Sequence, residues 1–174
     1  MFRSRLTSFL AVAAAVPLAA LAVTACGGGD NGTGSAAPTA SGQSATVDQA
    51  TAGDLGQILV DAKGRTLYLF QKDTGTNSAC TGACATNWPP LPDAGTPTVG
   101  TGLTAAKVGT TMRSDGTQQV TYNGHPLYLY VGDQKPGDTN GQGINAFGGG
   151  WFVLSPVGDM VSGTGSNSGG GNGY

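Results

Sequence analysis

Residues 64–73 read Gly-Arg-Thr-Leu-Tyr-Leu-Phe-Gln-Lys-Asp, and residues 124–133 read Gly-His-Pro-Leu-Tyr-Leu-Tyr-Val-Gly-Asp. Both stretches begin on Gly, alternate Leu with aromatic residues and end on Asp. Self-similarity at a fixed spacing is typical of a duplicated structural unit. The sequence therefore predicts one domain made of two related halves.

The alternation within each copy predicts a strand that is apolar on both faces. In residues 67–70 and again in residues 127–130, leucines occupy one side of an extended chain and aromatic residues the other. A strand with two apolar faces is covered on both sides. We therefore expect these two strands to lie centrally, between packed layers.

Turn signals around the two copies predict hairpins. Residues 57–61 and 65–70 flank an Ala-Lys-Gly turn, and residues 109–113 and 118–122 flank a Ser-Asp-Gly-Thr turn, in which Asp-Gly is a strong hairpin signal. A further Asn-Gly turn at 123–124 leads into the second copy. These elements predict antiparallel pairing.

Each copy is followed by a long loop and then a tryptophan. Trp88 begins a Trp-Pro-Pro-Leu run typical of an edge segment, whereas residues 151–154 read Trp-Phe-Val-Leu, as in a buried strand. Residues 102–108 are predicted to form one short helix. The chain contains 31 Gly, and its acidic residues are all Asp, which disfavours helix elsewhere. We predict an all-β fold, an antiparallel β-sandwich or barrel with pseudo-twofold symmetry.

The N-terminus predicts an exported lipoprotein. Two arginines precede a mildly apolar stretch that ends in Val-Thr-Ala-Cys at Cys26. Small residues before a cysteine are typical of the lipobox of bacterial lipoproteins, which this segment resembles. We expect residues 1–25 to be a signal peptide and Cys26 to become the acylated mature N-terminus. Two or three acyl chains such as palmitate anchor a protein stably in a membrane, on the extracytoplasmic face.

Composition divides the rest of the mature chain into three parts. Residues 26–52 are almost wholly small and polar, so we expect the lipidated Cys to be followed by a flexible linker. Residues 53–161 are predicted to form the duplicated domain, with repeats at about 55–98 and 109–158. Residues 162–174 are predicted to be a disordered tail.

Charge limits the kind of ligand. Without Arg3 and Arg5, six basic residues face ten Asp, a formal charge of −4. An anionic, sparsely charged surface argues against nucleic acid as a partner. The membrane, through the lipid anchor, and an envelope protein or a glycan remain as expected partners.

Cys80 and Cys84 remain as a pair outside the cytoplasm, where thiols are oxidised. A disulfide between them is therefore the expected state, and its role is to hold a loop. A soft-ligand copper site built from Cys80, Cys84 and His125, with Met112 as a nearby thioether, is the alternative that remains open.

The two copies resemble the signature of a family of secreted-repeat bacterial lipoproteins with a repeated Tyr-x-[Phe/Trp/Tyr]-x-x-Asp motif. The matching positions are the following: Tyr68, Phe70, Asp73, Tyr128, Tyr130 and Asp133. The similarity extends from about residue 55 to residue 158. It implies an exported envelope repeat protein of unassigned biochemical role.

Three further sites can be drawn on the motif and its loops. Asp73-Thr74-Gly75 matches the aspartic-protease triplet, but the second half lacks an equivalent triplet at Asp133, so Asx-turns explain these aspartates better. Residues 133–142 form an oxygen-rich loop whose spacing fits no EF-hand calcium site. The four motif aromatics form either a binding groove or core.

These observations predict a lipid-anchored extracytoplasmic envelope protein that acts as a binding or structural module. We expect no enzymatic activity and no cofactor. The alternative is a copper-binding or electron-transfer accessory lipoprotein that uses the two cysteines and His125.

Overall fold

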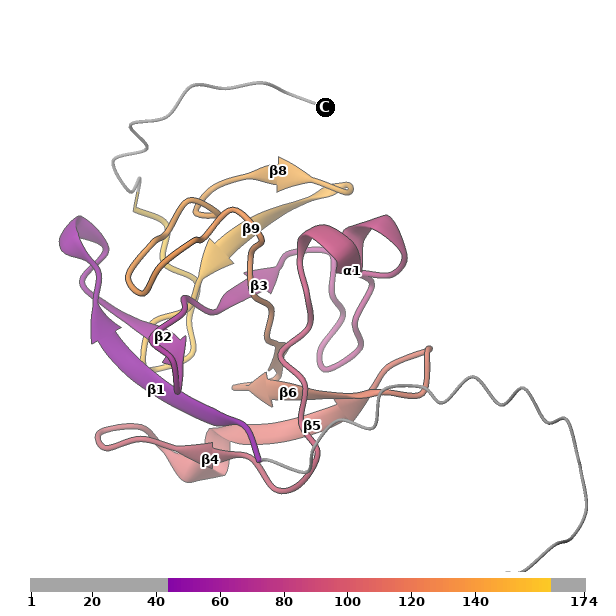
Figure 1. The fold of residues 1–174 in the computed structure, drawn as a ribbon, viewed down its shortest axis with the longest axis horizontal. Coiled ribbons are helices and arrows are strands. Elements are labelled where there is room, and N and C mark those ends of the chain that lie inside the picture. Colours follow the sequence, from indigo (N-terminus) through magenta and orange to yellow (C-terminus); the bar gives the residue numbers. More distant parts are fainter. Residues whose placement is uncertain (1–43, 164–174) are drawn as a thin grey trace, which may run out of the picture. The chain divides into compact units, whose positions relative to one another are not determined.

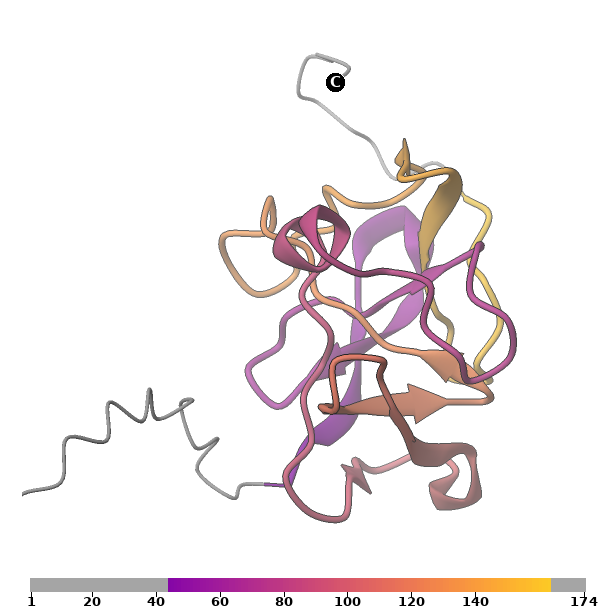
Figure 2. The same cartoon turned by 90° about the vertical axis from the view of Figure 1, so that its right-hand side faces the viewer.

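The computed structural model describes residues 44–163, and these residues form a β structure built from two related halves. The strands are β1 (Thr46–Thr51), β2 (Gln57–Asp61), β3 (Tyr68–Phe70), β4 (Thr98–Val99), β5 (Val108–Met112), β6 (Gln118–Tyr122), β7 (His125–Pro126), β8 (Asn145–Ala146) and β9 (Gly149–Val153). The helices are α1 (Ala83–Asn87) and the 3-10 turns η1 (Gly53–Leu55) and η2 (Ala105–Lys107). Figures 1 and 2 show their arrangement from two directions.

The strands form three small sheets, in the orders β2-β1-β4, β3-β9-β8 and β5-β6-β7. All pairings are antiparallel except that of β1 with β4. The all-β prediction is confirmed, and the three sheets do not close into a barrel. The predicted hairpin of 109–113 with 118–122 appears as β5 and β6, with register pairs from Val108–Tyr122 to Met112–Gln118.

A pseudo-twofold relationship links the two copies of the motif at their centre. The Tyr68 amide donates to the Tyr128 carbonyl at 2.9 Å, and the Tyr128 amide donates to the Tyr68 carbonyl at 3.0 Å. Equivalent bonds flank this pair, since Leu67 N donates to Leu59 O and Leu127 N donates to Val120 O, each at 3.0 Å. The two copies of the motif therefore pair with each other through the backbones of Tyr68 and Tyr128.

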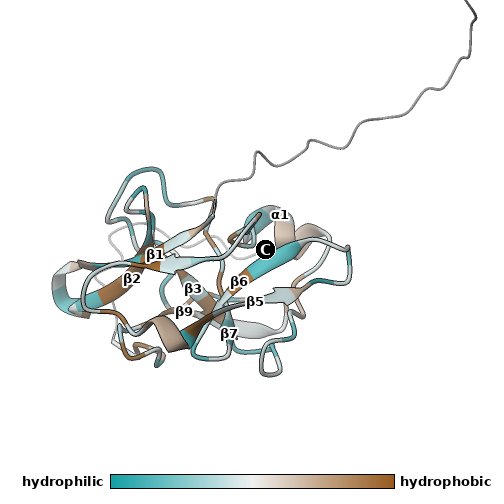
Figure 3. Cartoon of the chain, turned by 90° about the horizontal axis from the view of Figure 1, so that it is seen from below, coloured by the Kyte–Doolittle hydropathy of each residue, from teal (hydrophilic) through white to brown (hydrophobic). Residues whose placement is uncertain are grey.

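Both faces of these segments are apolar and buried, as predicted, and the alternating side chains separate into two clusters. The leucines of both copies join one apolar cluster with β6, while Tyr68, Phe70 and Tyr128 join a second cluster with both tryptophans and both cysteines. Figure 3 shows hydrophobic segments on β2 and β6 between the polar loops. The motif aromatics therefore form core, because Tyr68 and Tyr128 have no exposed surface and Phe70 has 2%.

The predicted end of the linker at residue 52 is wrong. Strand β1 lies within the predicted linker, pairs with β2 from Val47 to Thr51, and buries Val47 completely. Its other residues are small and polar, so its order comes from backbone hydrogen bonds to neighbouring strands, which composition does not reveal. The predicted signal peptide (residues 1–25), the predicted lipidation site Cys26 and residues 27–43 lie outside the described residues, as do residues 164–174 of the predicted tail.

Other local predictions are confirmed in part. The expected helix at 102–108 is the single turn η2. The strands expected at 65–70 and 126–131 are shorter, with regular pairing only in β3 and β7 and isolated bridges at Thr66 and Tyr128. The Trp-Pro-Pro-Leu run, expected at an edge, is largely buried, with Trp88 1% exposed. No helix among residues 44–163 is long and apolar enough to cross a membrane.

Candidate functional site

The motif residues form two hydrogen bonds that cross from one repeat to the other. The Tyr68 hydroxyl donates to Asp133 Oδ2 at 2.7 Å, and the Tyr128 hydroxyl donates to Asp73 Oδ2 at 2.8 Å. We call these two bonds the tyrosine–aspartate latches. A tight turn separates each motif Asp from the aromatic segment before it. In these turns Asp73 N donates to Phe70 O and Asp133 N donates to Tyr130 O. The signature is therefore a device by which each repeat holds the other.

The second oxygen of each latch carboxylate accepts from a backbone amide of its own loop. Asp73 Oδ1 accepts from Ala79 N at 2.7 Å, and Asp133 Oδ1 accepts from Asn140 N at 2.9 Å. The Asx-turns predicted for these aspartates are therefore wrong, because the bonded amides lie six and seven residues further along the chain, beyond the span of an Asx-turn. Each aspartate connects a loop of one repeat to the buried tyrosine of the other.

Burial shifts the protonation equilibria of the latches. Desolvation raises the pKa of Asp73 and that of Asp133 above the usual aspartate value, against the lowering effect of their hydrogen bonds. Desolvation, with the nearby carboxylates, also raises the pKa of Tyr68 and that of Tyr128 well above the normal phenol range. Both tyrosines therefore stay protonated and act as donors.

Six aromatic rings pack around the pseudo-twofold axis, and we call them the aromatic cluster. Trp88 and Trp151 stack face to face with centroids 3.9 Å apart and planes 6° apart. Phe70 stacks on the outer face of Trp151 at 4.1 Å, and Tyr130 stacks on Trp88 at 4.2 Å. The motif thus places its second aromatic residue on the tryptophan of the opposite repeat.

The latch tyrosines contact the edges of the same tryptophans. The Tyr68 ring meets Trp88 at 5.3 Å and the Tyr128 ring meets Trp151 at 5.2 Å, both nearly perpendicular. Gly141 covers this contact, because a Cβ there would lie 2.8 Å from both Trp88 and Tyr68. The cluster is accordingly sealed on that side by backbone.

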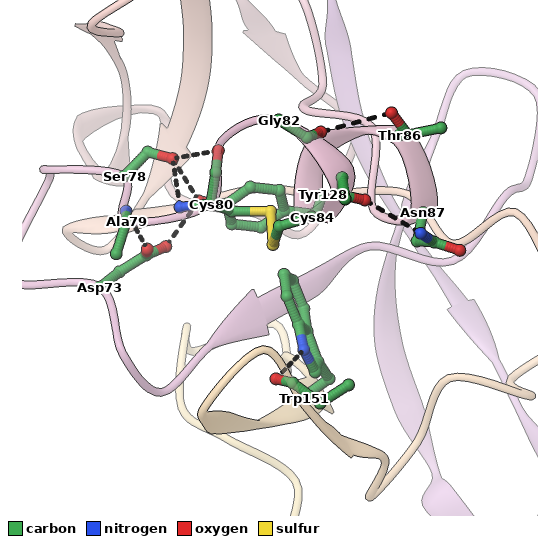
Figure 4. Close-up of a disulfide and its surroundings, with 12 residues drawn as sticks. Asp73, Ser78, Ala79, Cys80, Gly82, Cys84, Thr86, Asn87, Tyr128 and Trp151 are labelled. Carbon is green, nitrogen blue, oxygen red and sulfur yellow. Dashed lines mark hydrogen bonds between the residues drawn. A yellow bond between two sulfur atoms is a disulfide. The ribbon is translucent and has the colours of Figure 1, made fainter. Parts of the chain in front are cut away.

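The disulfide predicted between Cys80 and Cys84 is present, with its Cα atoms 5.2 Å apart. Cys80 is fully buried and Cys84 is 5% exposed. Figure 4 shows the sulfur atoms beside Tyr128 and close to Trp151, at the start of α1. The disulfide therefore belongs to the core and holds the loop that leads from Asp73 to Trp88.

Arg113, which the sequence did not single out, fastens this loop from the other repeat. Its Nη1 donates to Ser78 Oγ and to Gln119 Oε1, each at 2.7 Å, and its Nη2 donates to the Cys80 carbonyl at 2.6 Å. Ser78 Oγ also lies 2.8 Å from the Tyr128 hydroxyl oxygen. In the sequence Arg113 stands next to a Ser-Asp-Gly turn and has the pattern of an exposed hairpin residue.

The sites drawn by analogy with metalloproteins and proteases are not assembled. The copper alternative needs two thiolates, and the disulfide joins the sulfur atoms of Cys80 and Cys84 to each other. His125 lies half-buried on β7. Among residues 44–163 no group of three or more His, Cys, Asp or Glu side chains is placed to hold a metal ion.

The protease and calcium analogies fail on hydrogen bonding. Proton sharing needs two carboxylates in contact, whereas Asp73 and Asp133 each bond a different tyrosine. In the oxygen-rich loop, Asp138 accepts from Lys135 Nζ and two backbone amides, and Gln142 Oε1 accepts from Val153 N. These oxygens serve to shape the loop.

The surface of residues 44–163 has hollows. One of about 200 Å³ is lined by Tyr130, Asp133, Arg65, Thr66, Pro89, Leu129 and Val131. A more open groove of about 640 Å³ runs between β4 and β5 and is lined by residues 95–99, Ala105 and residues 108–110. The two strands that wall this groove are edge strands of different sheets (Figure 1).

Comparison with known proteins gives a match to one family model. The model describes a secreted repeat of unknown function, and it matches residues 49–91 and 109–155, one copy on each half of the domain. The two matches together cover more than half of the chain. No curated protein and no solved structure matches the chain.

Proposed function

Because this chain belongs to a family of secreted repeats of unknown function, we propose that it is a lipid-anchored protein on the extracytoplasmic face of the cell membrane. In this proposal its two-repeat domain is a binding or structural module of the cell envelope and not an enzyme.

The anchoring part of the proposal is supported by the position of Cys26. A signal-like apolar stretch ends in small residues directly before this cysteine, and the secreted family requires an export signal of some kind. The first described strand begins at Thr46, so about twenty residues separate the acylated cysteine from the domain.

The structural part is carried by the tyrosine–aspartate latches. The polar groups of the motif bond to one another and to loop amides, within a mostly buried centre. A reactive carboxylate would need an oxygen free to exchange a proton with a substrate, whereas both oxygens of each motif Asp accept a hydrogen bond. The motif therefore supports a rigid two-repeat scaffold, which presents its loops and edges to other molecules.

The anchor is tested by metabolic labelling with an alkyne analogue of palmitate. The wild-type protein is expected to carry the label and to sediment with membranes, and Cys26→Ser is expected to lose both properties. The double variant Cys80→Ser, Cys84→Ser is the matched control, because it removes the other cysteines and should keep the label. Labelled, membrane-bound Cys26→Ser protein would contradict the lipid anchor.

We propose the groove between β4 and β5 as the surface at which a partner binds. Ladder bonds from Arg113 N to Thr117 O and from Asn123 N to Lys107 O set the alternation along β5, so the backbone groups of Thr110 point away from β6. Strand β5 has neither charged residues nor Pro, which usually protect an edge. An envelope protein that supplies an extended strand fits such an edge better than a glycan does.

The groove is tested by photo-crosslinking in cells, with a benzophenone amino acid at Val99 on the opposite wall. Thr110→Pro removes the outward N–H of the edge and is expected to abolish a discrete protein adduct. Thr110→Ala keeps that N–H and should retain the adduct. Equal adducts in both variants, or an adduct to glycan only, would contradict strand addition at this edge, while leaving the anchor unaffected.

A further inference from the structure

The aromatic cluster forms one continuous path of stacked rings through the second core. The order of the stack is Tyr130, Trp88, Trp151 and Phe70, and successive centroids lie 4.2, 3.9 and 4.1 Å apart. Electron tunnelling between rings falls steeply with distance, so stacked rings are strongly coupled. Tryptophan and tyrosine are also the aromatic side chains that lose an electron most readily.

The two ends of the path differ, although the repeats are related by symmetry. Tyr130 is half-buried and lines the hollow of about 200 Å³, so one end of the path reaches the surface. The equivalent residue in the other repeat is Phe70, which is 2% exposed and is difficult to oxidise. The stack therefore has one accessible redox-active end and one closed end.

Each tryptophan also contacts a tyrosine that has a proton acceptor in place. Tyr68 lies against Trp88 and donates to Asp133 Oδ2 at 2.7 Å, and Tyr128 lies against Trp151 and donates to Asp73 Oδ2 at 2.8 Å. A phenol that loses an electron becomes a strong acid, so its oxidation is favoured when a carboxylate can take the proton at once. Packing alone would be served equally by phenylalanine at these two positions, without the cost of burying carboxylates.

We propose that the aromatic cluster is a relay for single electrons, with Tyr130 as its port at the surface and the two tyrosine–aspartate latches as its inner sites of oxidation. The relay would serve to take up oxidising equivalents from a one-electron oxidant at the envelope, such as a peroxide-derived radical. It requires neither the lipid anchor nor a partner in the β4–β5 groove.

The proposed cycle balances in electrons and protons. The oxidant takes one electron at Tyr130 and is reduced, and electron transfer through Trp88 refills Tyr130 at the expense of Tyr68. The Tyr68 O–H bond breaks as its proton passes to Asp133 Oδ2, which leaves a neutral tyrosyl radical and a neutral carboxylic acid. A one-electron reductant such as a thiol or a hydroquinone then restores the electron through the same port, and the proton returns from Asp133 to Tyr68. Tyr128 and Asp73 perform the same step beyond Trp151.

The relay is tested by flash oxidation of the full-length protein, with photogenerated ruthenium(III) tris-bipyridine as the oxidant. Transient absorption and electron paramagnetic resonance then follow tryptophan and tyrosyl radicals. In the wild type a tyrosyl radical shielded from solvent is expected after the tryptophan signal decays. In the double variant Tyr68→Phe, Tyr128→Phe that shielded radical should be absent and the tryptophan radical should live longer.

Tyr122→Phe is the matched control. Tyr122 is fully buried and hydrogen-bonded to the Pro156 carbonyl, but it lies in the other core. Its loss is expected to leave the radical kinetics unchanged. If Tyr122→Phe removes the shielded radical, or if the double variant keeps it, the relay is overturned.

Two further variants keep the test valid if the double variant fails to fold. Asp133→Asn and Asp73→Asn together remove the proton acceptors and are expected to slow tyrosyl formation at least about tenfold, the effect of about 1.4 kcal/mol on the barrier. Tyr130→Leu removes the port and should slow the first appearance of a tryptophan radical. Unchanged rates in both variants would contradict the relay, whatever the fate of the double variant.

Discussion

The hydroxyl of Tyr68 lies 2.7 Å from Asp133 Oδ2, so a strand of the first repeat is bonded to a loop of the second. The same relationship is repeated in reverse between Tyr128 and Asp73. Neither half can satisfy its own buried tyrosine, and neither tryptophan has its full set of stacking partners within one half. The two repeats are consequently expected to fold as one cooperative unit.

Loss of one latch hydroxyl should destabilise the domain without removing apolar packing. Tyr68→Phe leaves Asp133 Oδ2 and the Gly141 amide each without a partner, and we expect a loss of about 1–3 kcal/mol in the free energy of unfolding. Urea denaturation measures this change. Tyr130→Phe is the control, because no hydrogen bond of the Tyr130 hydroxyl exists among the described residues, and equal losses in both variants would contradict the latch.

The latch carboxylates should make stability depend on pH in an unusual direction. Burial raises the pKa of Asp73 and of Asp133 above 3.8 in the folded state, so folding strengthens proton binding. The resulting stability is present below the unfolded-state pKa and is lost as pH rises through the folded-state pKa. The stability advantage of the wild type over Asp73→Asn, Asp133→Asn should therefore shrink as pH rises from about 3 to about 7.

Asp115→Asn supplies the opposite sign as a control for that titration. The hydrogen bonds from Thr117 lower the pKa of Asp115, so its stabilising contribution is present above the unfolded-state pKa and is lost as pH falls. The advantage of the wild type over Asp115→Asn should grow as pH rises. Urea midpoints across the pH series measure both trends. If both advantages grow as pH rises, folding does not raise the pKa of the latch carboxylates.

Arg113 should be needed to hold the disulfide loop. The two Nη atoms of its buried guanidinium donate to three acceptors, of which the Cys80 carbonyl and Ser78 belong to the loop. A lysine cannot reproduce this fork, so Arg113→Lys is expected to cost roughly 1.5–3 kcal/mol, the worth of one charge-assisted hydrogen bond.

Chemical denaturation together with limited proteolysis of residues 74–82 measures the effect of Arg113→Lys. The control is Asp115→Ala, which removes the exposed partner of Arg113 at 3.4 Å and should change stability by less than about 1 kcal/mol. A lysine variant as stable and as protease-resistant as the wild type would show that the fork is dispensable.

Phe147 stands at the tip of the β8–β9 hairpin in a conformation that suits Asn or Gly. Its φ is +57°, its side chain is 41% exposed, and the comparable turn at residues 123–124 uses Asn with φ +50°. Phe147→Asn is therefore expected to stabilise the domain by about 1 kcal/mol. Thermal unfolding measures the shift, with Gly148→Ala, at φ +86°, as a variant expected to move in the opposite direction. A lower melting temperature for Phe147→Asn would mean that its ring contributes contacts that outweigh the strain.

Local patterns in the chain predicted most of the elements. Alternation of Leu with aromatic residues placed 67–70 and 127–130 between two cores, and the Asp-Gly turn predicted β5 and β6. The export context predicted the pairing of Cys80 with Cys84. These features depend on neighbouring residues or on a very short loop, and a sequence displays them directly.

Strand β1 and Arg113 escaped prediction for a common reason. The composition of Thr46–Thr51 is that of a linker, and its order comes from pairing with β2 and β4. Arg113 has the sequence context of a turn residue and is buried only because another repeat's loop lies over it. In both cases the decisive partner is distant along the chain.

The duplication, the strand faces and the disulfide were thus determined by the sequence alone, because side-chain alternation and turn geometry act within a few residues. Only the tertiary structure decided that each Asp bonds the tyrosine of the opposite repeat and that the two tryptophans stack on each other. The motif places a Tyr and an Asp in each copy, and this pattern does not indicate whether the Tyr bonds the Asp of its own copy or that of the other. Packing two copies around one axis is what selects the second arrangement.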